Sequence, residues 1–155
     1  MGPGMKRFGL ALLALGALIC DPCLAERKPI AVQTLQDLRF GRLVKEPARS
    51  GVVLVDPADG VRLFSGGVYD LDGDYGPAEF EISGEPGATF RITPPGGLSL
   101  GSGCRVVAVT VDPGLVGTLG ANGKAIVRLG GKLELRPNSA HGMQKAVLTV
   151  QAEYL

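Results

Sequence analysis

The sequence predicts an all-β protein, an immunoglobulin-like antiparallel β-sandwich of about seven to eight strands. Its 155 residues include 24 glycines and 11 prolines, which separate short runs rich in β-branched residues. No segment keeps apolar residues at the spacing of an amphipathic helix for long. Because no helix is predicted to cover a parallel sheet, we expect two antiparallel sheets packed face to face. A small closed β-barrel is the alternative.

Strand signals recur from residue 30 to the end of the chain. We expect strands at residues 30–40, 51–55, 61–68, 78–83, 89–93, 105–111, 124–135 and 145–154. In the strand at 78–83, Phe80 and Ile82 alternate with glutamates, so one face is predicted to be buried and the other wet. The asparagine-glycine pair at Asn122 is typical of a hairpin turn.

The first 25 residues have the composition of a secretory signal peptide. Lys6 and Arg7 precede an apolar run, and we expect cleavage after Ala25. Residues 26–36 would then form an N-terminal extension or first strand, and residues 37–155 one β-sandwich domain. The apolar run is shorter than the about 20 residues that an anchor needs. We therefore expect an exported protein without a transmembrane anchor, in the periplasm, at the cell surface as a fimbrium, or secreted.

The charge balance argues against two classes of partner. Removing Lys6, Arg7 and Asp21 with the leader from 16 basic and 15 acidic residues leaves 14 of each. The remaining chain has no basic cluster. We therefore expect binding neither to nucleic acid nor to an anionic membrane surface.

The sequence contains no recognisable catalytic set. His141 is the only histidine, and Cys104 is the only cysteine after the leader, so neither a zinc cluster nor a cysteine-histidine pair can assemble. The glycine-rich stretch at 117–124 fails as a phosphate loop, because Thr118 stands where a glycine is required. We expect a protein that is not an enzyme and holds no cofactor. Cys104 is interpreted either as a lone, partly buried thiol or as half of an interchain disulfide.

An acidic stretch at residues 70–81 resembles a calcium-binding loop in part. Asp70, Asp72, Asp74 and Glu81 stand at positions one, three, five and twelve, but Tyr75 replaces the glycine of the sixth position. Two interpretations follow: a calcium site, or a solvated acidic loop between strands. The first belongs to an alternative function, a secreted or periplasmic β-sandwich module that binds glycan or calcium.

The C-terminal residues alternate between apolar and polar side chains. Five of them are predicted to share one face of the last strand: Ala146, Leu148, Val150, Ala152 and Tyr154. The chain is expected to end inside this strand. Whatever lies beside the strand must then come from elsewhere in the chain or from another molecule.

This ending resembles that of chaperone–usher pilin subunits, in which an aromatic residue is next to last and a glycine stands fourteen positions from the end. Tyr154 and Gly142 occupy those positions here. The resemblance implies an incomplete sandwich, completed by β-strand addition from a neighbouring subunit. The donor would be residues 26–36, through Ile30 and Val32, unless that segment pairs within its own sandwich. Copies of the chain, other pilus subunits and a periplasmic chaperone are the implied partners.

A wider resemblance covers nearly all of the chain after the leader. The segments that carry it are Leu38-Arg39-Phe40-Gly41, residues 51–55, residues 78–93, Leu129-Gly130-Gly131-Lys132-Leu133 and the closing strand. In this order they resemble the secreted bacterial family called domain of unknown function 4402. The resemblance implies a small, exported, fimbria-like β-protein without enzymatic activity. The sequence departs from the usual ending at Gly142-Met143-Gln144-Lys145.

Overall fold

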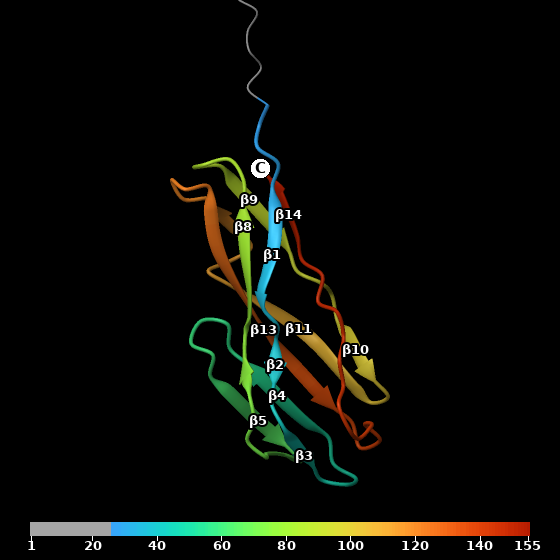
Figure 1. Cartoon of the computed structure of the whole chain (residues 1–155). Helices are drawn as coiled ribbons and strands as arrows, with labels where there is room; N and C mark the ends of the chain where they lie inside the picture. The colour runs from blue at the N-terminus through green and yellow to red at the C-terminus, as the bar shows by residue number, and fades with distance from the viewer. Residues whose placement is uncertain (1–25) are drawn as a thin grey trace, which may run out of the picture.

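The computed structural model describes residues 26–155, and this part of the chain is built from strands and loops (Figure 1). Its strands are β1 (Ala31–Gln36), β2 (Arg39–Phe40), β3 (Leu43–Lys45), β4 (Gly51–Val55), β5 (Arg62–Gly66), β6 (Val68–Asp70), β7 (Tyr75–Gly76), β8 (Ala78–Ser83), β9 (Thr89–Thr93), β10 (Leu98–Gly101), β11 (Cys104–Asp112), β12 (Val116–Thr118), β13 (Lys124–Leu135) and β14 (Gln151–Tyr154). The predicted signal peptide, residues 1–25, lies outside the described residues. Residues 26–155 offer no helix capable of spanning a membrane.

Strand β13 is the centre of the main antiparallel sheet. One of its edges pairs with β11, while the other pairs with β8 along Lys124–Leu129 and with β4 along Gly131–Leu135. The sheet therefore runs β1-β8-β13-β11-β10, with β4 and β5 attached to the second half of β13. The sheet is curled, but its edge strands β1 and β10 do not pair with each other.

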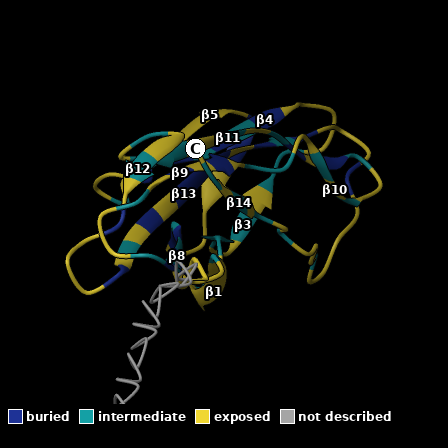
Figure 2. Cartoon of the chain, turned by 90° about the horizontal axis from the view of Figure 1, so that it is seen from above, coloured by how far each residue is buried: buried dark blue, intermediate teal, exposed yellow. Residues whose placement is uncertain are grey.

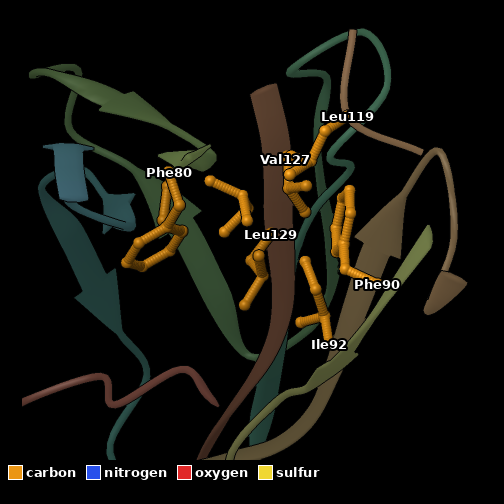
Figure 3. Packing of buried hydrophobic residues seen from close by; sticks show 8 residues of the cluster. Phe80, Phe90, Ile92, Leu119, Val127 and Leu129 are labelled. Carbon is orange, nitrogen blue, oxygen red and sulfur yellow. The ribbon is translucent and has the colours of Figure 1, made fainter. Parts of the chain in front are cut away.

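A second antiparallel sheet, of order β12-β9-β14, covers one half of the main sheet. Phe90 and Ile92 of β9 face Val127 and Leu129 of β13, as Figure 3 shows. The buried members of this first core cluster are Ala78, Phe80, Ile82, Phe90, Ile92, Leu119, Val127 and Leu129. The other half of the molecule encloses a second cluster, made of Val53, Val68, Cys104, Val106, Leu133 and Leu135. The predicted all-β, sandwich-like fold is thus confirmed.

The alternation predicted for residues 78–83 is also confirmed. Phe80 and Ile82 are buried in the core, while Glu79 and Glu81 form ion pairs with the next strand. Glu79 lies 2.7 Å from Arg128 Nε, and Glu81 lies 2.8 Å from Lys124 Nζ. The inner face therefore supplies apolar burial and the outer face supplies cross-strand charge pairs.

The structure corrects the strand bounds in three places. The segment predicted as one strand at 61–68 is divided into β5, which ends at Gly66, and β6, which begins at Val68. The segment predicted as one strand at 30–40 is divided into β1 and β2, with a register shift between Thr34 and Gln36. The last strand begins at Gln151 instead of residue 145. Gln151 pairs with Thr93, the last residue of β9, and the two residues that follow Thr93 in the sequence are Pro94 and Pro95. Since proline has no backbone N–H, the ladder ends there.

Candidate subunit-interaction surface

The two ends of the described chain lie side by side at one end of the molecule, where β1 and β14 run next to each other (Figure 1). β1 is an edge of the main sheet and β14 is an edge of the second sheet. The residues predicted to take part in subunit interaction lie in these two strands or in the segments that precede them. Val32 is in β1, Ala152 and Tyr154 are in β14, and the others precede these strands: Ile30, Gly142, Ala146, Leu148 and Val150. We call the surface formed by residues 26–36 and 142–155 the terminal surface.

Tyr154 joins the two ends directly. Its hydroxyl donates a hydrogen bond to the Lys28 carbonyl oxygen at 2.6 Å and accepts one from the Glu85 backbone N–H at 2.7 Å. Its ring lies under the Arg27 guanidinium, whose central carbon is 3.8 Å from the ring centroid. One aromatic side chain therefore holds the N-terminal segment and the β8–β9 turn together.

Two residues of the β8–β9 turn complete this contact. The Lys28 backbone N–H donates to Glu85 Oε2 at 3.2 Å. At Gly84 a Cβ would lie closer to the Tyr154 hydroxyl than the 3.0 Å that real Cβ atoms respect, so only glycine leaves room for the phenol. Sequence analysis missed Arg27, Lys28, Gly84 and Glu85. The glycine beside Glu85 was the available signal, but nothing local connects it to the end of the chain.

The N-terminal segment pairs with its own sandwich in this structure. β1 runs antiparallel to β8, with Val32 opposite Ile82 and Thr34 opposite Phe80. Ile30 packs against the first core cluster, whereas Val32 is 36% exposed. β1 is exposed at five of its six positions. Figure 2 accordingly shows this strand largely in the colour of exposed residues. The donor segment expected from the pilin resemblance is therefore a loosely covered edge strand here.

The C-terminal segment matches the predicted face in part. Leu148, Val150, Ala152 and Tyr154 all pack against the first core cluster, but Ala146 is exposed. Gly142 has a φ of 90°, which favours glycine, and a Cβ there would meet open space.

Residues 142–150 of the terminal surface have backbone N–H and C=O groups without backbone partners in the part of the chain that the structure describes. Within residues 26–155, no backbone–backbone hydrogen bond involves this stretch. Its side chains nevertheless alternate in burial from Leu148 onward, as in a strand. Residues 148–150 thus have the side-chain pattern of a strand, and residues 142–150 lack a strand partner within the described chain.

Two aspartates of the acidic loop form ion pairs with arginine side chains. Arg62 Nη2 lies 2.5 Å from Asp70 Oδ2, and Arg39 Nε lies 3.1 Å from Asp74 Oδ2. Asp72 has a φ of 68°, and its N–H donates to Asp70 Oδ1 at 2.7 Å, which forms a turn. No group of three or more acidic, histidine or cysteine side chains that suits a metal ion occurs among residues 26–155. The calcium-binding alternative therefore finds no preformed ligand set in this loop.

The remaining reactive side chains lie outside the terminal surface. Cys104 is a free thiol, 5% exposed, in the second core cluster. Burial raises the pKa of this thiol, so the reactive thiolate is disfavoured. This fits the interpretation of a lone buried thiol. His141 is exposed.

The fold and the terminal surface define a class: an antiparallel β-sandwich whose first and last described strands lie side by side at sheet edges. Residues 30–154 match the family described as domain of unknown function (DUF4402), and the chain belongs to that family. The match spans both β1 and β14, as the sequence resemblance implied. Comparison with curated proteins and with solved structures found no match.

Proposed function

We propose that this chain is an exported, non-enzymatic structural protein of the periplasm or cell surface, a fimbria-like subunit that assembles by β-strand addition. The observation that carries the proposal is the state of the first and last strands of the described chain, β1 and β14. Both lie on unpaired sheet edges, and residues 142–150, whose side chains alternate in burial from Leu148 onward, have no backbone partner in the described chain.

The physical argument concerns the backbone groups of these edges. An unpaired strand edge presents a row of N–H and C=O groups that an added strand can satisfy. Natural edges are commonly protected by charge or proline, but β1 (Ala-Val-Gln-Thr-Leu-Gln) carries neither. Each hydrogen bond of a new ladder contributes about 0.5–1.5 kcal/mol, and alternate side chains set the register.

The partners of such assembly are chains that present an extended apolar-alternating segment. Residues 26–36 of another copy are the nearest example, with Ile30 and Val32 on one face. Other pilus subunits and a periplasmic chaperone belong to the same proposal, since a chaperone would protect unpaired edges before assembly.

Deletion of residues 26–36 from the full exported chain tests this function. We expect the intact protein to self-associate with time or concentration, and the deletion variant to remain a monomer. A synthetic peptide of residues 26–36 should raise the Tm of the deletion variant, while the same peptide with Val32→Asp should have less effect. An intact protein that stays monomeric at all concentrations, together with a deletion variant whose Tm ignores the peptide, would contradict the proposal.

A further inference from the structure

We propose that the outer edge of β8 is the acceptor surface for strand exchange, and that it takes β1 of a second copy in the register seen within one chain. Tyr154 of the acceptor then closes on the Lys28 carbonyl of the donor. The inference rests on the proposed assembly by strand addition. It specifies which edge accepts, which segment enters and which side chain retains it.

β1 can leave without opening the core. Its ladder joins it to β8 on one side, and its other edge is unpaired in the sheet. Every buried member of the first core cluster comes from β8, β9, β13 or Leu119, and none comes from β1. Detachment therefore costs one edge ladder, the partial burial of Ile30 and the contacts that Tyr154 and Glu85 make with the N-terminal segment, while the sandwich keeps its central packing.

The chain also has a hinge at the required place. The β1–β8 register shifts between Thr34 and Gln36, which weakens the ladder at the end of β1. Asp37 follows and is exposed, and β2 then pairs with β7. Rotation at Asp37 would release residues 26–36 as a unit and leave β2 in place.

The occupant of the emptied edge follows from the contacts within one chain. Removal of β1 leaves the outer backbone edge of β8 without its ladder partner. The segment known to fit this edge is β1 itself, with Val32 opposite Ile82 and Gln33 opposite Glu81. A second copy restores all of these contacts, so the exchanged and unexchanged states differ mainly at the hinge.

Tyr154 is the retaining contact. In one chain it binds Lys28 through its hydroxyl and Arg27 through its ring, and Glu85 accepts the Lys28 N–H. In the exchanged state Tyr154 and Glu85 belong to the acceptor copy, whereas Arg27 and Lys28 belong to the donor copy. Since donor and acceptor surfaces of one copy are different, the contact is head-to-tail and propagates into chains or closed rings.

Disulfide formation between introduced cysteines tests the proposed register between β1 of one copy and β8 of another. Gln33 and Glu81 are opposite one another on the outer face, at a separation that suits a disulfide. One exported chain carries Gln33→Cys and a second carries Glu81→Cys. The two are mixed when folded and, in parallel, refolded together, then oxidised and resolved by non-reducing electrophoresis.

A mixed disulfide between the two variants is the expected result. Gln33→Cys mixed with Lys132→Cys is the matched control, because exposed Lys132 pairs with β4 and β11 and lies on neither β1 nor β8. The double variant in one chain should form an intrachain disulfide, which shows that the positions can react. With that control positive, absence of the mixed disulfide in both protocols overturns the inference.

The disulfide experiment distinguishes failure of the proposed acceptor edge from failure of assembly by strand addition. If the intact protein assembles but no mixed disulfide forms, strand addition stands and its acceptor is another edge, such as residues 142–150. If the mixed disulfide forms, the β8 edge is the acceptor.

Tyr154→Phe tests the retaining contact. Loss of the hydroxyl bonds should raise the initial rate of mixed-disulfide formation between folded chains about tenfold. Tyr75→Phe is the control, because no hydrogen bond is formed by the Tyr75 hydroxyl within residues 26–155. An unchanged rate in Tyr154→Phe would show that Tyr154 does not retain the strand.

Discussion

Gly84 and Tyr154 form a fitted pair, since the phenol hydroxyl occupies the space where a side chain at residue 84 would begin. The same hydroxyl bonds the Lys28 carbonyl and the Glu85 N–H. A turn glycine, the penultimate residue and the N-terminal segment thus depend on one another. The contact links the two ends of the described chain, which are separated by more than a hundred residues.

Gly84→Ala should destabilise the protein. The new methyl group would displace the Tyr154 hydroxyl and would lie 3.0 Å from Leu119 Cδ1 in the first core cluster. Overpacking of this kind costs about 1–3 kcal/mol, measured as the free energy of unfolding in urea.

Gly96→Ala is the matched control, because a Cβ at Gly96 meets no atom within 4 Å. It should change the free energy of unfolding by less than about 0.5 kcal/mol. Equal effects of the two substitutions would contradict the role assigned to the close approach at Gly84.

The stability that comes from the Glu46–Tyr69 pair should depend on pH. The Tyr69 hydroxyl hydrogen-bonds Glu46, which lowers the pKa of Glu46 below its ordinary 4.5 and raises the pKa of Tyr69 above its ordinary 10.0. Arg49 lowers the Glu46 pKa further. A carboxyl with a lowered folded-state pKa stabilises above its unfolded pKa, and this contribution is lost as the pH falls through the folded pKa.

Tyr69→Phe should therefore lower the Tm most between about pH 5 and 9, where Glu46 is ionised and Tyr69 is neutral in both states. The difference from the unaltered protein should shrink below pH 4, as Glu46 becomes protonated. Both groups are solvent-exposed, so the effect on Tm should be small. Melting curves between pH 2.5 and 9 measure it, and a difference that grows towards acid pH would reverse the sign argued here.

Alternation and turn chemistry were sufficient to predict the longer strands. The strands at 51–55, 78–83, 89–93 and 124–135 appear with the expected bounds. The short pairs β2-β7 and β3-β6 were not anticipated, because two or three residues carry no period of their own. Their pairing depends on the second core cluster that they cover, which is assembled from distant parts of the sequence.

The sequence predicted single residues of the terminal surface, but it did not predict which of them touch one another. Tyr154 and Ile30 were identified from alternation and from the pilin resemblance, and both lie on the terminal surface. That Tyr154 reaches Lys28 depends on where the two sheets bring their edges, which no local pattern encodes. Arg62 illustrates the same limit: it reads as an exposed strand residue, yet its side chain is 3% exposed and pairs with Asp70.

Cys104 should resist modification in the folded protein. Its thiol is buried in the second core cluster and its pKa is raised by burial, so both access and thiolate fraction are reduced. A thiol reagent at pH 8 should react with Cys104 only when denaturant unfolds the chain.

Ser99→Cys supplies the comparison, because Ser99 is exposed on the neighbouring strand β10. The introduced thiol should react at once, while Cys104 in the same protein stays unreactive. Immediate loss of two thiols per chain would show that the second core cluster opens readily, and would return interchain pairing of Cys104 to consideration.

Pro94 and Pro95 should set the length of the last strand. The β9–β14 ladder ends where Thr93 pairs with Gln151, although Val150 and Leu148 continue the alternating pattern. Replacing both prolines by threonine and valine supplies the missing N–H groups and suits a strand. β9 would then extend opposite residues 149–150. In this register the Thr149 N–H faces β9, so the Thr149 amide should exchange with solvent about tenfold more slowly, since it gains a hydrogen bond of about 1 kcal/mol.

Gly96→Ala, which keeps both prolines, should leave the exchange of the Thr149 amide unchanged. If the double replacement leaves this amide unprotected as well, the side-chain packing of residues 142–150, rather than the prolines of β9, holds this segment away from the ladder.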